Sequence, residues 1–257
     1  MPSPTSPSLT VPRRFRGPAS SGNGGWTSGA LAAYLPGASA VTVRLFAPPP
    51  LQTPMTVEVG RADDGSGRRV AVALADGQMV LRAAETADDL DALDAVDAGV
   101  AREAESRYGG AAEHPFPECF ACGTGRERGD GLALRPGPVT KAQDGLAGAV
   151  VATTWEPTPA QAGADGVVTA PVAWAALDCP GGWSVNLVGR PMVLGTMTTA
   201  LGRLPRVGER CVVVGRCERS EGRKAWTVST LRGDGGEVLG RARAVWIAVN
   251  PAAVQPR

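Results

Sequence analysis

Two helical segments with almost no polar face constrain this sequence more than any other feature. The first, residues 21–37, places an Asn and a Gly pair before a run of small residues and ends at Pro-Gly. The second, residues 168–187, is apolar over most of its length. A helix that is apolar on nearly all sides must be covered on most of them. We therefore expect both helices to lie inside the protein against β-sheet.

Each of these helices precedes four β-rich runs that are separated by Pro, Asp or Gly turns. The runs after the first helix are 41–50, 53–60, 68–77 and 78–85, and those after the second are 191–204, 209–217, 224–233 and 237–249. Two further runs, 130–138 and 146–155, come before the second helix. The repeated order predicts an α+β protein with two antiparallel sheets, each wrapped around a central helix and able to join edge to edge. The alternative is two ordinary α+β sandwiches with surface helices.

The repeat divides the chain into parts. We expect residues 11–86 to form the first unit and residues 128–252 the second. Residues 1–10, rich in Pro and Ser, predict a disordered tail. Residues 87–127 connect the units with a helix and then a Cys-x2-Cys crossover. Apolar residues at helical spacing indicate that this connecting helix is amphipathic and packs on a sheet: Leu90, Leu93, Val96 and Val100.

Charge and cysteine content narrow the classes of partner and location. The 257 residues include 26 basic and 25 acidic ones, so no overall field favours nucleic acid or an anionic membrane. No segment approaches the roughly 20 apolar residues of a membrane span. Five cysteines in so long a chain do not form the pattern of a disulfide framework. We expect a cytoplasmic protein with reduced thiols that does not bind nucleic acid or membranes, with a homodimer as a possible state.

Two strings resemble a known signature. Asn23-Gly24-Gly25 with its helix, and the string from Thr169 to Asp178, resemble two diverged copies of the H-G-G-x(6)-D helix signature of the phenylacetyl-CoA-type hotdog thioesterases. In addition, the string C-F-A-C-G at 119–123 followed by G-L-A-L at 131–134 is similar to an opening found in related thioesterase-like proteins. The resemblance covers residues 13–250 and implies a double hotdog that acts on an acyl-CoA or similar thioester, without a cofactor.

The family also implies roles for these residues. In such enzymes the N–H groups of the Gly pair polarise the thioester carbonyl, and an acid on the other unit's helix attacks it or activates water. A helix start suits the first task because its N–H groups are unpaired and lie at the positive end of the dipole. On this resemblance the catalytic residues are Asn23, Gly24, Gly25 and Asp178.

The two copies are unequal. The position of the acid is Ala32 in the first copy, so that helix has donors but no carboxylate. The second copy has Asp178, but Pro171 stands where a Gly would supply an N–H. Each half lacks what the other keeps, and this predicts one composite site in which the Asn23-Gly24-Gly25 turn faces Asp178.

Each candidate also has a structural explanation. Asp178 lies two residues before Pro180, which should kink or end the helix, so its carboxylate could bind loose backbone. Asn23 before two glycines is a good N-cap whatever the function, and Gly24 and Gly25 could simply permit a tight turn. If the chemistry has been lost, the alternative function is a non-catalytic protein that binds or scaffolds acyl thioesters.

The string from His114 to Gly123 allows a metal-dependent alternative. Cys119 and Cys122 with His114 nearby supply part of a zinc site, but no fourth ligand is evident and the other cysteines are distant in sequence. The structural alternative is a crossover in which both cysteines pack as small apolar groups, and we predict no metal.

The single histidine also limits the reaction. Hotdog dehydratases need a His on or near the central helix, and serine hydrolases need a G-x-S-x-G elbow with a His partner. Neither arrangement occurs, and Rossmann and P-loop fingerprints are absent too. Hydrolysis of an acyl-CoA or acyl-carrier thioester remains, with Asp178 as general base or nucleophile.

Overall fold

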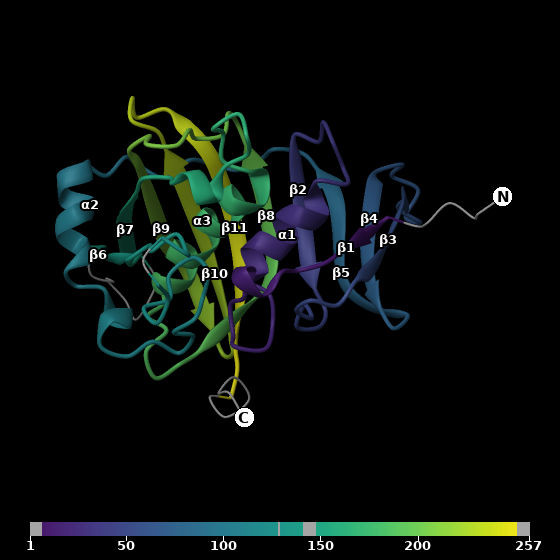
Figure 1. Cartoon of the computed structure of the whole chain (residues 1–257), viewed down its shortest axis with the longest axis horizontal. Coiled ribbons are helices and arrows are strands. Elements are labelled where there is room, and N and C mark those ends of the chain that lie inside the picture. The colour runs from purple at the N-terminus through teal and green to yellow at the C-terminus, as the bar shows by residue number, and fades with distance from the viewer. Residues whose placement is uncertain (1–6, 128, 141–147, 251–257) are drawn as a thin grey trace.

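A computed structural model describes residues 7–127, 129–140 and 148–250 (Figure 1). Its helices and longer strands are α1 (Gly24–Ala32), α2 (Ala98–Glu105), α3 (Ala170–Trp183), β2 (Ala40–Leu45), β3 (Met55–Arg61), β4 (Arg69–Ala75), β5 (Gln78–Thr86), β7 (Val150–Trp155), β8 (Met192–Leu201), β9 (Cys211–Glu221), β10 (Lys224–Arg232) and β11 (Val238–Ala248). The short strands are β1 (Ser8–Leu9) and β6 (Gly137–Thr140). None of the helices in the described residues is long and apolar enough to cross a membrane.

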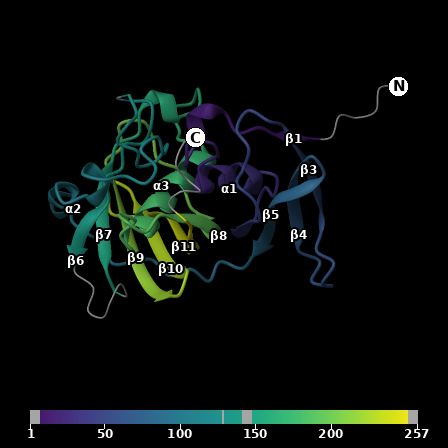
Figure 2. The ribbon, with the colours of Figure 1, turned by 90° about the horizontal axis from the view of Figure 1, so that it is seen from below.

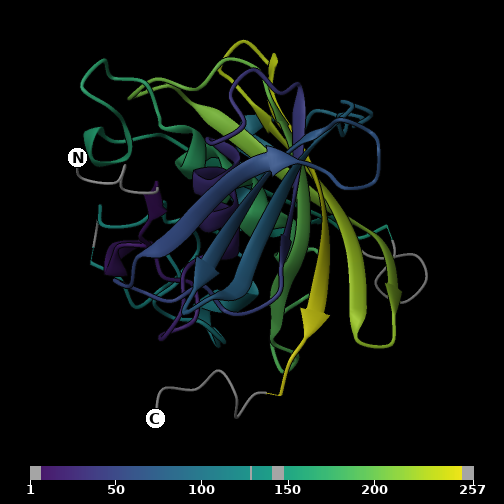
Figure 3. The same ribbon diagram turned by 90° about the vertical axis from the view of Figure 1, so that its right-hand side faces the viewer.

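The strands of the described residues form one antiparallel sheet of eleven strands, so the two predicted sheets are joined edge to edge into one. The order is β1-β3-β4-β5-β2-β8-β11-β10-β9-β7-β6. The first strand after each helix, β2 or β8, lies at the middle, and the other strands of each half extend outward in matching order. Joining these two strands leaves neither half with an unpaired inner edge, which is the physical reason that the halves share one sheet. In Figure 3 the strands of the two halves cross at an angle, as the twist of a wide sheet requires.

The register at the middle of the sheet relates the two halves. Val41 pairs with Thr199, and Val43 pairs with Met197. Between these pairs the hydroxyls of Thr42 and Thr198 lie 2.8 Å apart across the join. The hydrogen bond between equivalent strands fixes how the helix of one half is placed against the helix of the other.

The helices α1 and α3 pack against each other on one face of this sheet (Figure 2). Twelve of the fourteen residues of α3 are buried, as the apolar sequence predicted. Glycines allow the close approach: a Cβ at Gly25 would lie 2.8 Å from the carbonyl oxygen of Trp174, and one at Gly29 would lie 2.7 Å from its Cγ. The alternative prediction, two sandwiches with α1 and α3 on the surface, is therefore wrong. Nor does Pro180 end α3, which continues to Trp183.

The connector is helical over a shorter range than we predicted. The chain is extended before α2, and its backbone is held by side chains of the sheet: Leu93 N–H donates to the Thr230 hydroxyl at 2.9 Å, and its carbonyl accepts from Arg232 at 2.7 Å. Leu90 and Leu93 are buried, whereas Val100, within α2, is exposed. The helical spacing of these leucines was misleading because extended chain with satisfied backbone groups buries them equally well.

The connector and α2 cover the opposite face of the sheet. Leu93 packs with Val212 and Val214 of β9, whereas Val213, between them in sequence, belongs to the core under α3. Alternate residues of a strand point to opposite faces, so the second half of the sheet is covered on both sides.

Part of the segment predicted as a disordered N-terminal tail lies in a β-strand. Residues 1–6 lie outside the described residues, but Ser8 and Leu9 form β1 against β3, and Leu9 is buried. An apolar side chain that can cover the core, together with an open sheet edge, explains why a Pro- and Ser-rich segment is ordered here.

Candidate active site

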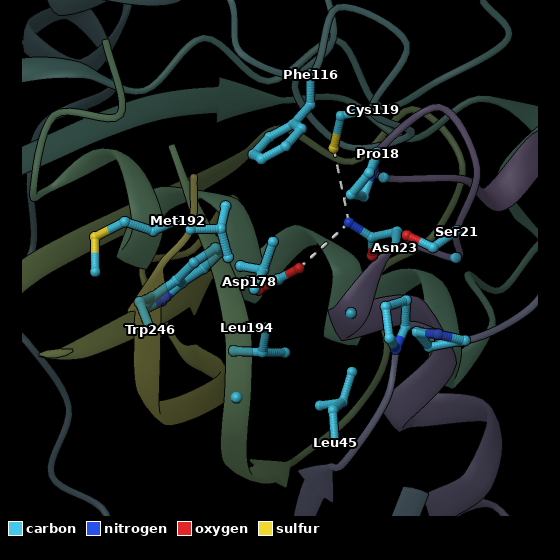
Figure 4. A pocket seen from close by; sticks show the side chains of 18 of the residues that line it. Pro18, Ser21, Asn23, Leu45, Phe116, Cys119, Asp178, Met192, Leu194 and Trp246 are labelled. Atoms are coloured by element: carbon cyan, nitrogen blue, oxygen red, sulfur yellow. Dashed lines mark hydrogen bonds between the residues drawn. The ribbon is translucent and has the colours of Figure 1, made fainter. Parts of the chain in front are cut away.

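A pocket of about 350 Å³ opens where the start of α1 meets the middle of α3 (Figure 4). Its walls are mostly apolar and come from β8, β11 and the loops before α1 and after β2. The side chains around it include Leu45, Phe116, Met192, Leu194 and Trp246. Few polar side chains line the pocket. Two of them, Asn23 and Asp178, lie next to each other.

Asn23 has two tasks at the start of α1. Its side-chain oxygen accepts from the N–H of Trp26 at 2.8 Å, which makes it the N-cap that the sequence predicted. Its amide nitrogen donates to Asp178 Oδ2 at 3.2 Å and lies 3.7 Å from Cys119 Sγ. The structural and the functional explanations of Asn23 are therefore compatible, because different atoms carry them.

The two glycines after Asn23 differ in what their N–H groups contact. Gly25 N–H donates to Asp178 Oδ2 at 3.0 Å. Gly24 lines the pocket, and its N–H has no hydrogen-bond partner within residues 7–127, 129–140 and 148–250. Both are tightly packed: a Cβ would lie 2.5 Å from Asp178 Cβ at Gly25, and 2.8 Å from Leu194 Cβ at Gly24.

Asp178 is fully enclosed by this arrangement, with 2% of its surface exposed. Burial raises the pKa of its carboxyl to about 7 from an ordinary value of 3.8, and the charge of the Cys119 sulfur acts in the same direction. The N–H of Gly25 and the amide of Asn23 oppose that shift because they stabilise the ionised form. Its second oxygen, Oδ1, is buried and has no hydrogen-bond partner in the described part of the chain. Among the described residues, therefore, one oxygen of Asp178 is held by two donors and the other by none.

The opposite helix start lacks these features. Thr169 caps α3 without a side-chain hydrogen bond, and Pro171 has no N–H. The space next to Pro171 is filled by α1, since a Cβ at Gly29 would lie 2.8 Å from its Cα. The structure thus brings Asn23, Gly25 and Asp178 into contact across the two halves, with Gly24 beside them.

Several solved structures are similar to this chain in fold over most of its length. A tesB protein of Mycobacterium avium subsp. paratuberculosis matches with a TM-score of 0.58 at 13% identity, over 94% of this chain and 91% of its own. An acyl-CoA thioesterase II, TesB2, of Mycobacterium marinum matches with a TM-score of 0.56 at 14% identity, over 96% and 93%. A protein from Alicyclobacillus acidocaldarius described as having a hot dog fold matches with a TM-score of 0.60 at 15% identity, over 95% and 93%. This chain has the hotdog fold.

The likeness is one of structure alone. No family model matches the chain, and no curated protein matches it in sequence. At 13–15% identity the shared hotdog fold carries over, and the chemistry has to be argued from the residues of this chain.

Three cysteines lie beside the carboxylate in this hotdog fold. The Sγ atom of Cys179 lies 3.2 Å from that of Cys122 and 3.8 Å from that of Cys119. All three are buried, free thiols. Hydrogen bonds from the two neighbouring thiols lower the pKa of Cys119. The Cys-x2-Cys string indicated two of these residues, whereas Cys179 was missed, although its position directly after Asp178 was a signal that could have found it.

His114 does not complete a site with these cysteines. Its Nε2 lies 3.0 Å from the carbonyl oxygen of Cys122, and its Nδ1 accepts from the N–H of Phe116 at 2.9 Å. Burial lowers the pKa of the imidazole. Both ring nitrogens of His114 thus contact backbone groups of the segment 114–123. The histidine stabilises this turn and is not placed as a metal ligand beside the cysteines.

Proposed function

We propose that this protein hydrolyses an acyl thioester at one composite site between two hotdog units, the first carrying α1 and the second α3. The similarity in fold to proteins named as thioesterases supports thioester hydrolysis as the general reaction. One observation carries the proposal. The carboxylate of Asp178, on α3, is held against the start of α1 by one oxygen, and its other oxygen is buried without a partner among the described residues.

The start of α1 supplies the electrophilic part of the site. The Gly24 N–H, which has no partner among the described residues, lies on the first turn of a helix, where the dipole favours negative charge. It would bind the thioester carbonyl oxygen and stabilise the oxyanion that forms when the carbonyl carbon is attacked. The Gly25 N–H, which the family resemblance also assigned to this task, holds Asp178 instead.

Asp178 supplies the base. With Oδ2 fixed by Gly25 and Asn23, Oδ1 would take a proton from water as the water oxygen bonds to the carbonyl carbon. Collapse of the tetrahedral intermediate breaks the C–S bond, and the thiolate leaves with the proton that Asp178 accepted. The products are a carboxylic acid and a free thiol.

The pocket favours a neutral, apolar acyl group. Among the described residues that line it, none is Lys, Arg or His, so nothing there would pair with a carboxylate on the acyl chain. A second negative charge next to Asp178 would also be repelled. We expect straight, branched or aromatic acyl groups to be accepted and acyl groups with a terminal carboxylate to be rejected.

A panel of acyl-CoA thioesters tests the proposal, with release of free CoA thiol as the readout. Turnover of neutral acyl groups by the parent protein, lost in Asp178→Asn, is the expected result. Thermal stabilisation by acyl-CoA without release of thiol would instead identify a binding or scaffolding protein and overturn the proposal. In H₂¹⁸O, label found in the Asp178 carboxylate after one turnover would show that this residue attacks the thioester directly and is not a base.

A further inference from the structure

We propose that Cys119, Cys122 and Cys179 form a binding site for one thiophilic d¹⁰ cation of the Zn²⁺ type. Their ligand atoms all lie within 4.8 Å of one another. Two tetrahedral Zn–S bonds of about 2.3 Å place their sulfurs about 3.8 Å apart. The separation of Cys119 and Cys179 is 3.8 Å and that of Cys122 and Cys179 is 3.2 Å, so small side-chain rotations would seat the ion.

The three ligands are held before any ion arrives. Cys119 N–H donates to Phe116 O, and Gly123 N–H donates to Cys119 O, each at 2.9 Å, which fixes the turn that carries two of the thiols. The Tyr108 hydroxyl donates to Cys122 O at 2.9 Å. Cys179 lies on α3, the most deeply buried helix. A site formed by a rigid turn and a rigid helix does not have to be organised by the metal.

The surroundings of the sulfurs also suit bound thiolates. Trp183 Nε1–H donates to Cys122 Sγ at 3.3 Å, and Asn23 Nδ2 lies 3.7 Å from Cys119 Sγ. Such N–H groups around metal-bound sulfur compensate its charge where water is excluded.

The ligand set selects the kind of cation. Three sulfurs favour Zn²⁺, Cd²⁺ or Cu⁺ over Mg²⁺ or Ca²⁺, which require oxygen ligands. All three cysteines line the pocket next to Asp178, so the ion has a route to the site and its remaining coordination position faces the pocket. This inference does not depend on thioester hydrolysis, and its test needs no substrate.

The test uses the full-length protein, stripped with a chelator and kept reduced. Titration with Cd²⁺, followed by sulfur-to-metal charge-transfer absorption, and with Zn²⁺ against a chromophoric chelator, should each give one ion per chain with a Kd below about 1 μM. Cys122→Ser and Cys179→Ser should weaken binding by at least about 10²-fold. Cys211→Ser and Cys217→Ser are the matched controls, because these two buried cysteines of β9 lie outside the cluster, and they should bind like the parent.

Alkylation followed by mass spectrometry keeps the test decisive if a cluster variant does not fold. In the parent protein Zn²⁺ should slow alkylation of the three cluster thiols and leave the rates of Cys211 and Cys217 unchanged. Substoichiometric uptake by the reduced protein, or equal losses in cluster and control variants, would overturn the proposal. So would protection that appears only after oxidation, since that would identify a disulfide between Cys122 and Cys179.

Discussion

The amide nitrogen of Gly25 lies 3.0 Å from a carboxylate oxygen of Asp178, although 153 positions separate the two residues. The contact joins the start of one central helix to the middle of the other. It is possible only because residue 25 has no side chain, since a Cβ there would lie 2.5 Å from Asp178 Cβ. The close packing of the two helices and the position of the carboxylate therefore both depend on Gly25.

Replacing Asp178 with Asn should separate activity from folding. The amide keeps the shape of the side chain but cannot take a proton, so turnover should fall by at least about 10²-fold. Cooperative unfolding should remain. Asp234→Asn serves as the matched control because this exposed acid pairs with Arg210 at the surface, and thiol release should be unchanged. Equal turnover by Asp178→Asn and the parent would remove Asp178 from the reaction.

Two substitutions at Asn23 should separate its capping from its role beside Asp178. Asn23→Ser keeps an oxygen that can accept from Trp26 N–H but loses the amide donor to Asp178. Its unfolding free energy should change little while turnover falls. Asn23→Ala loses both and should also be destabilised by about 1 kcal/mol in urea denaturation. Full activity in the Ser variant would show that Asn23 is only a cap.

The Gly25 contact predicts a large effect of one methyl group. Gly25→Ala should force α1 and α3 apart and lower the free energy of unfolding by about 1–3 kcal/mol. Because the same Cβ displaces Asp178, turnover should fall as well. Gly60→Ala is the control, since a Cβ at that position of β3 meets nothing within 4 Å, and its effect should stay within about 0.5 kcal/mol. Equal stability of the two variants would contradict the close approach.

The buried carboxyl should make stability depend on pH in a defined direction. Its pKa is about 7 in the folded protein and about 4 in the unfolded chain, so the folded state binds the proton more tightly. The free energy of unfolding should therefore fall as pH rises from about 4 to about 7 and change little above that range. Urea denaturation of reduced, chelator-treated protein measures this component as the difference between the parent and Asp178→Asn. A difference that does not vary across this range would show that the carboxyl has an ordinary pKa.

The sequence predicted the parts of this protein whose properties are local. Two helices with no polar face had to be buried, and the four strands after each could be located from turn residues and β-branched runs. The unequal pair of helix starts was also visible, because Pro171 lacks an N–H and Ala32 lacks a carboxylate in any fold. Such properties belong to the residue itself and need no knowledge of its neighbours.

Tertiary structure decided what depends on distant partners. Hydrogen bonding between β2 and β8 decided which strands join the sheets of the two halves into one. Side chains of β10 and β11 held the connector extended where leucine spacing predicted a helix. Cys179 met the Cys-x2-Cys turn only because α3 runs beside the crossover. The spacing of apolar residues predicts which face of an element is buried. It does not predict which distant group hydrogen-bonds to a given backbone atom or contacts a given side chain.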